Sequence, residues 1–146
     1  MDEKLIPTGE IKAVAGTPFD FTEPRVVGEK IEEEDIQLKR GLGYDHCWVL
    51  NEQDNGVRFA ASAHHPASGR FLEVFTDEPG IQFYTGNFLD GTLPQAGGEG
   101  TYDRRTGFCL ETQHYPDSPN QENFPSVVLE PGEKYTSKTS FKFSVK

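Results

Sequence analysis

The chain has 146 residues, a length that suits one domain with a single core. Its formal net charge is −10 and its basic residues are scattered, so the chain is not expected to bind nucleic acid. The 11 phenylalanines and 5 tyrosines exclude a disordered chain, because disordered chains are poor in aromatic residues.

Residues 29–38 (EKIEEEDIQL) form the first segment with any periodicity. Three apolar residues, Ile31, Ile36 and Leu38, stand among five acids. This pattern permits one short turn of surface helix, but a solvated linker is the preferred interpretation.

From residue 47 onward, short strands separated by Gly, Pro, Asn and Asp are expected. Asn55-Gly56 predicts a tight turn after the first strand, and PASG (66–69) predicts a turn after the second. The first three strands are therefore expected to form an antiparallel meander. The expected strands cover residues 47–51, 57–65, 70–77, 81–88, 106–113 and 135–146.

The last expected strand alternates cleanly between apolar and polar residues. Phe141, Phe143 and Val145 fall on one face, and lysines and serines fall on the other, as in a half-buried antiparallel strand. Several short strands at this spacing predict an all-β fold, an antiparallel β-sandwich or a barrel.

Glu111 is the first candidate site residue. Alternation along residues 106–113 places Cys109, Glu111 and Gln113 on one face of the strand, with Phe108 and Leu110 pointing to the core. A carboxylate on a groove wall can act as a general base. An ordinary exposed glutamate is the alternative interpretation.

Asp45 and Gln82 are two further candidates. Asp45, in GYDHCW (43–48), can accept hydrogen bonds from ligand hydroxyls, or it can satisfy the backbone of its own turn. Gln82, in IQFYTGNF (81–88), can both donate and accept, although a plain surface amide is the alternative. Tyr84 shares the face of Gln82 and offers a flat wall for a sugar ring.

The spacings of common metal and phosphate sites do not occur in the sequence. The four histidines contain no HxxxH pair, the two cysteines form no CxxC, and GGEG (97–100) is not followed by the lysine of a phosphate loop. No metal and no cofactor is expected. No apolar run approaches about 18 residues, so no membrane partner is expected either. Two cysteines and no leader indicate a reduced, cytoplasmic protein.

Several stretches resemble the galactose mutarotase (aldose 1-epimerase) family, in the family's order and over nearly the whole chain. The resemblance implies a large antiparallel β-sandwich that interconverts the α and β anomers of D-galactose or D-glucose without a cofactor. It implies that Glu111 is the catalytic base and that Asp45 and Gln82 bind the sugar. The stretches are LIPTGEI (5–11), TPFDF (17–21), GYDHCWVL (43–50), ASGRFLEVFTDEPGIQFYTGNFLDGT (67–92) and GFCLETQHYPDSPNQENFPSVVLEPGEKY (107–135).

The resemblance also shows two departures. Cys47 stands where the family often has Asn. The family's general-acid histidine belongs to an NHxYFNL-like motif upstream of the matching region, and this motif is absent here. Residues 1–146 are therefore expected to be the C-terminal part of a single aldose 1-epimerase domain. The alternative is an inactive fragment or short isoform that acts as a weak carbohydrate-binding or interaction module.

Overall fold

The structure is a computed structural model that describes residues 1–52 and 56–146. The predicted Asn55-Gly56 turn lies partly outside the described residues. The chain divides into two compact units, each formed from two segments. The first unit comprises Met1–Cys47 and Gln82–Glu111, and the second comprises Trp48–Ile81 and Thr112–Lys146.

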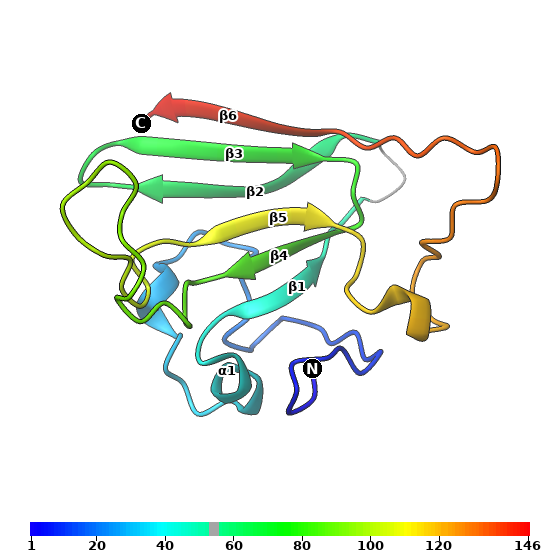
Figure 1. Cartoon of the computed structure of the whole chain (residues 1–146), viewed down its shortest axis with the longest axis horizontal. Helices are drawn as coiled ribbons and strands as arrows, with labels where there is room; N and C mark the ends of the chain where they lie inside the picture. Colours follow the sequence, from blue (N-terminus) through cyan, green and yellow to red (C-terminus); the bar gives the residue numbers. More distant parts are fainter. Residues whose placement is uncertain (53–55) are drawn as a thin grey trace. The chain divides into compact units, whose positions relative to one another are not determined.

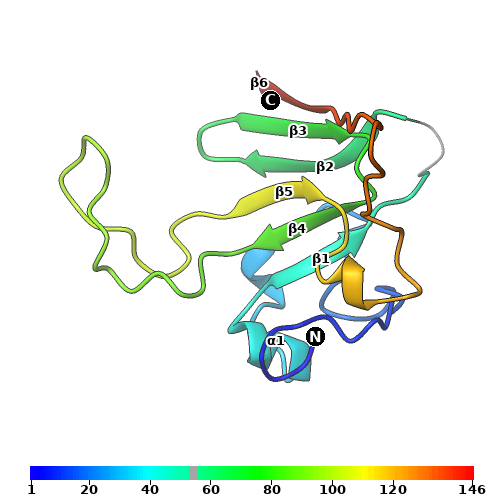
Figure 2. The same ribbon diagram turned by 45° about the vertical axis from the view of Figure 1, so that its right-hand side comes forward.

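Strands dominate the described part of the chain, which confirms the all-β prediction. Two three-stranded sheets form, with strand orders β1-β4-β5 and β2-β3-β6. Figure 1 shows β4 running opposite to β1 and β5, and Figure 2 shows β2, β3 and β6 side by side. The elements are η1 (Val27–Glu29), α1 (Ile36–Gly41), β1 (Asp45–Val49), β2 (Arg58–His65), β3 (Arg70–Thr76), β4 (Gly80–Tyr84), β5 (Cys109–Gln113), η3 (Ser118–Asn120) and β6 (Thr139–Val145).

The predicted meander is wrong for its first strand. β2 and β3 pair antiparallel, from Arg58↔Thr76 to His65↔Arg70, across the expected turn at residues 66–69. β1 instead joins the sheet of β4. The amide of Leu50, just past β1, donates to the carbonyl of Pro79 at 3.0 Å, just before β4. This non-local pairing takes β1 away from β2.

The linker interpretation of residues 29–38 is also wrong. Helix α1 begins after Asp35, whose carboxylate accepts hydrogen bonds from the amides of Gln37 (2.7 Å) and Leu38 (3.4 Å). Such a side chain satisfies amides that the first helical turn leaves without partners. Ile31 and Leu38 are only 6% and 3% exposed. Residues 36–38 therefore open a short capped helix, Ile31 and Leu38 are buried, and Ile36 is 58% exposed.

An aromatic cluster forms the core of the first unit. Tyr44 is fully buried and stacks on Phe83 with ring centroids 5.5 Å apart. Phe21 meets both rings edge-on, and Phe108 meets Phe83 in the same way at 5.8 Å. Phe108 is 46% exposed, so only one side of its ring packs into this core. These residues mark the apolar face of β1, β4 and β5 within this unit.

The second unit is built on the β2-β3-β6 sheet. β6 pairs with β3 from Arg70↔Val145 to Thr76↔Thr139, and Val74 and Thr76 are fully buried. The alternation predicted for β6 is present, but its half-burial is not. Phe141, Phe143 and Val145 are 52%, 77% and 78% exposed.

Candidate functional site

Polar residues collect on the face of β1, β4 and β5 that lies opposite the aromatic cluster. Side chains along a strand alternate between the two faces of a sheet. Tyr44 and Phe83 belong to the aromatic face, so their neighbours Asp45 and Gln82 point to the other face. In β5, Glu111 lies three positions after the core residue Phe108, which places it on the face of Asp45 and Gln82.

A hydrogen bond joins Asp45 and Gln82 directly. The amide Nε2 of Gln82 donates to Oδ1 of Asp45 at 2.8 Å, and both side chains are half-buried. The other end of the Gln82 amide, Oε1, is shielded from solvent and has no hydrogen-bond partner among the described residues. A buried acceptor without a partner is costly. One end of the Gln82 amide is therefore held by Asp45, and the other end carries a buried acceptor that no described residue satisfies.

Glu111 is exposed on the edge strand β5, as predicted for a residue facing a groove or solvent. The nearby Cys109 thiol reports on its surroundings. The pKa of Cys109 is raised by burial first, then by the negative charge of Glu111 and by a hydrogen bond to Glu111, and finally by the charge of Asp45. Cys109 and Glu111 lie two positions apart in β5, so they share a face of the strand. Both carboxylates therefore act electrostatically on the same thiol.

Tyr84 contributes an aromatic surface at the end of β4. Its ring stacks on Phe88 with an interplanar angle of 16°, and its hydroxyl accepts the amide N–H of Phe88 at 3.0 Å. The half-exposed Phe88 extends the flat surface that the sequence predicted for Tyr84 alone.

His46 is a contributor whose role the sequence did not reveal. Its Nδ1 accepts the backbone N–H of Asp45 at 3.0 Å, and its ring meets Phe19 edge-on at 4.8 Å. The sequence motifs predicted no histidine at the site. The adjacency of Asp and His in GYDHCW was the available signal, but adjacency alone does not say which nitrogen meets which group.

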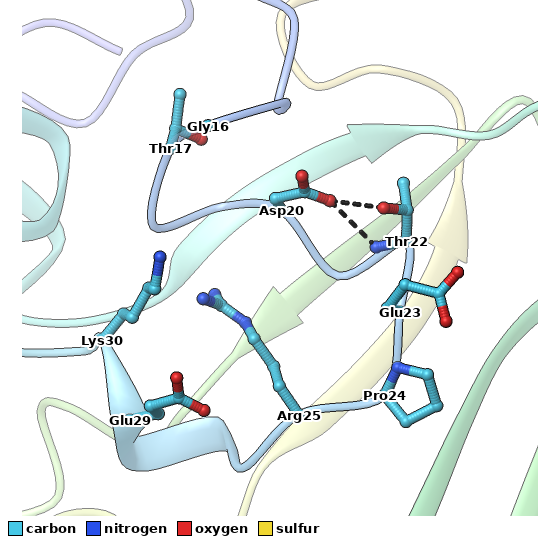
Figure 3. A pocket seen from close by; sticks show the side chains of 9 residues that line it. All are labelled: Gly16, Thr17, Asp20, Thr22, Glu23, Pro24, Arg25, Glu29 and Lys30. Atoms are coloured by element: carbon cyan, nitrogen blue, oxygen red, sulfur yellow. Dashed lines mark hydrogen bonds between the residues drawn. The ribbon is translucent and has the colours of Figure 1, made fainter.

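A separate open pocket of about 280 Å³ lies elsewhere in the first unit (Figure 3). Asp20 in its wall bonds to the amide and hydroxyl of Thr22, and Arg25 donates to Pro18 and Tyr44. Three acids and two cations mix in its lining, so the pocket favours neither ligand charge. None of the predicted site residues belongs to it. The lining consists of Gly16, Thr17, Asp20, Thr22, Glu23, Pro24, Arg25, Glu29 and Lys30.

Metal and membrane features were also sought in the described residues. Within residues 1–52 and 56–146, no three His, Cys, Asp or Glu side chains are grouped so as to hold a metal ion. In the same ranges, no helix has the length and apolarity needed to cross a membrane. Neither Cys47 nor Cys109 forms a disulfide bond within the described residues.

The profile of the aldose 1-epimerase family matches residues 1–142, and the chain belongs to this family. Among its relatives are the galactose mutarotases of Bos taurus and Homo sapiens, which are 52% and 51% identical over 145 residues. The aldose 1-epimerase of Escherichia coli is 39% identical over 145 residues. These alignments cover 98–99% of this chain but only 40–41% of the relatives, so the chain spans about 40% of their length.

Solved structures give the same assignment. An aldose epimerase homologue from C. elegans superposes with a TM-score of 0.85 at 28% identity, covering 99% of this chain and 42% of that one. A galactose 1-epimerase from Lactobacillus acidophilus superposes with a TM-score of 0.68 at 25% identity, covering 99% and 40%. The resemblance stated from the sequence motifs is therefore confirmed, as is the galactose mutarotase-like, all-β sandwich class.

Proposed function

We propose that this chain takes part in the interconversion of the α and β anomers of D-galactose or D-glucose. Glu111 serves as the general base, and Asp45 and Gln82 bind sugar hydroxyls. The observation that carries the proposal is the Gln82–Asp45 hydrogen bond of 2.8 Å, on the same sheet face as Glu111. The relatives named galactose mutarotase and aldose 1-epimerase support the choice of reaction.

The chemistry needs one base and one acid. The base removes the proton of the C1 hydroxyl while the acid protonates the ring oxygen, and the bond from C1 to the ring oxygen breaks to leave an open-chain aldehyde. Rotation about the C1–C2 bond turns the other carbonyl face toward the C5 hydroxyl, and closure reverses both proton transfers. Hydrogen bonds from Asp45 and Gln82 hold the sugar in place while its end rotates.

The general acid is assigned to no residue of this chain. We propose that residues 1–146 form the C-terminal part of a single aldose 1-epimerase domain and that the acid comes from the complementary part. The chain's 40% coverage of its relatives supports this reading. The two cysteines form no disulfide within the described residues, which suits a reducing compartment, so we propose that the protein acts in the cytoplasm.

Polarimetry on freshly dissolved α-D-galactose tests the proposal. The chain is assayed alone and mixed with the part of bovine galactose mutarotase that lies outside the alignment. We expect the mixture to exceed the buffer rate and Glu111→Gln to lower that excess by about 10²- to 10⁴-fold, as for the loss of a general base. Glu99→Gln, an exposed change in the same unit, should leave the rate unchanged.

Two outcomes would count against the assignment. A Glu111→Gln mixture as fast as the original would remove Glu111 from the role of base. A mixture no faster than buffer, in which the chain still binds galactose, would favour the alternative of a carbohydrate-binding module without catalysis.

A further inference from the structure

The backbone of Asp45 is held by the side chain of the next residue. The N–H of Asp45 donates to Nδ1 of His46 at 3.0 Å. Tyr44, immediately before, bonds instead to Thr85: its amide donates to the hydroxyl of Thr85, and its carbonyl accepts the amide of Thr85 at 3.0 Å. The amide of Asp45 thus has a side-chain acceptor at the point where β1 starts.

This hydrogen bond fixes the tautomer of His46. A neutral imidazole carries one N–H and one lone pair, so a ring that accepts at Nδ1 must carry its proton on Nε2. Nε2 is shielded from solvent, and a backbone hydrogen bond with Gln37 favours the protonated ring.

The surroundings of His46 keep the ring neutral. Burial lowers its pKa to about 4, the positive α-amine of Met1 acts in the same direction, and the carboxylate of Asp35 and the Gln37 backbone oppose the shift. The ring also packs against Phe19, and its Cε1 would lie 3.3 Å from a Cβ placed on Gly41. The neighbouring charged groups are therefore Met1, Asp35 and Asp45.

We propose that His46 is the positioning residue of the candidate sugar site: its Nδ1 lone pair fixes the backbone of Asp45, so that the Asp45 carboxylate meets Gln82. The proposal deepens the proposed function and rests on it for its meaning in sugar binding. Protonation of His46 would place a second donor opposite the Asp45 N–H, and the hydrogen bond would be lost. His46 touches no substrate in this scheme and acts only through Asp45.

The tautomer and the coupling can be measured directly by NMR on the ¹⁵N-labelled chain. Long-range ¹H–¹⁵N spectra should show the Nε2–H form at neutral pH, with protonation only near pH 4. An Asp45→Asn background removes the titration of residue 45 itself. In that background the chemical shift of the backbone amide of residue 45 should still change with pH, with the same midpoint as the titration of His46. An Nδ1–H tautomer, or an amide that ignores the His46 titration, would overturn the proposal.

Two substitutions separate positioning from simple packing. His46→Asn puts an amide oxygen close to the place of Nδ1 and keeps an acceptor, whereas His46→Leu keeps bulk but removes the acceptor. The side-chain NH₂ signals of Gln82 report its hydrogen bond to Asp45 without any sugar. They should move toward those of a free amide in His46→Leu and stay in place in His46→Asn. Unchanged Gln82 signals in a folded His46→Leu chain would refute the positioning role.

Galactose titrations extend the test to the site. We expect His46→Leu to weaken galactose binding by about 10-fold, the effect of losing one hydrogen bond of ~1.4 kcal/mol. His46→Asn should bind within about threefold of the original chain, a difference well below 1 kcal/mol. Equal binding by His46→Leu and the original chain would contradict the proposal. If the original chain binds no galactose, the proposed function fails, and the NMR measurements still decide the role of His46.

Discussion

At the scale of single residues, Arg58 shows how a buried charge is satisfied in the second unit. Its guanidinium donates to the carbonyls of Asn51 (2.8 Å), Thr76 (3.0 Å) and Glu78 (3.0 Å), with a longer contact to Gly56 (3.4 Å). These carbonyls belong to the segment before β2, to the last residue of β3 and to the turn that follows it, so one side chain links the paired strand ends to the segments that flank them. Buried charges need such partners.

Replacement of Arg58 should therefore destabilise the second unit strongly. Arg58→Leu leaves several buried carbonyls without donors, and we expect a loss of about 2–4 kcal/mol in the free energy of unfolding. Urea titration followed by circular dichroism measures it. Arg70→Leu, at an exposed position of β3, is the matched control and should change stability by no more than about 0.5 kcal/mol. Equal effects of the two changes would argue against this role for Arg58.

The buried His46 predicts how stability depends on pH. Its pKa falls from 6.5 to about 4 on folding, so the unfolded chain binds more protons between these values. The His46 contribution is complete above pH 6.5 and decreases as pH falls toward 4. Carboxylates titrate here as well, so the test is the difference in unfolding free energy between the original chain and His46→Asn. As the pH falls from 6.5 to 4, the original chain should lose more unfolding free energy than His46→Asn does. A difference that stays constant with pH would contradict the prediction.

The identities of the site residues followed from motifs, but their contacts did not. Alternation predicted the shared face of Cys109 and Glu111, and both residues lie in strand β5 of the structure. The Gln82–Asp45 bond joins residues 37 positions apart, which no local pattern reveals. The sequence motifs assigned His46 no role, because that role depends on which ring nitrogen meets the Asp45 amide.

At the scale of elements, the strand boundaries were set by side-chain bonds that the pattern of residues does not show. The expected strand 81–88 ends at Tyr84. Beyond it, the side-chain Nδ2 of Asn87 donates to the carbonyls of Gly41 and Tyr44, both at 2.8 Å, and Gly86 has a φ of 66°. These contacts turn the chain into a loop. The sequence therefore located the strand and missed its end.

The β2–β3 hairpin offers an element-level prediction through Gly69. Its φ is 70°, and a Cβ there would lie 2.8 Å from the backbone oxygen of Lys146, just past β6. Gly132 has a φ of 93° but nothing within 4 Å. Gly132→Ala should cost about 1 kcal/mol from the backbone conformation alone, and Gly69→Ala about 2–3 kcal/mol because the end of β6 must move.

Urea titration compares the two glycine variants, and hydrogen exchange at the Lys146 amide gives a local readout. That amide bonds to the carbonyl of Gly69 at 2.9 Å, so its exchange should accelerate in Gly69→Ala only. Equal destabilisation by the two variants would show that the close approach to Lys146 is unimportant.

At the scale of the whole molecule, the apolar side of β6 is an exposed surface. Phe141, Phe143 and Val145 stand on a strand at the edge of its sheet, and edges with exposed apolar residues invite pairing with another chain. The sequence predicted the alternation of β6 correctly. It did not predict the exposure, because coverage of a sheet face depends on what packs against it.

We expect this surface to cause self-association. Phe143→Glu should lower the apparent mass measured by light scattering at high protein concentration. Ser144→Glu adds the same charge to the opposite face of β6 and should leave the association intact. A chain that stays monomeric at every concentration, with Phe143→Glu indistinguishable from it, would contradict this expectation.

The measurement closest to the central claim is a galactose titration of the ¹⁵N-labelled chain, followed amide by amide. Asp45, Gln82 and Glu111 lie on one sheet face, so we predict saturable shifts confined to these residues and their neighbours in β1, β4 and β5. Asp45→Asn should weaken them. Shifts that gather instead around the pocket of Figure 3, or no shifts at saturating galactose, would contradict the assignment of the sugar site.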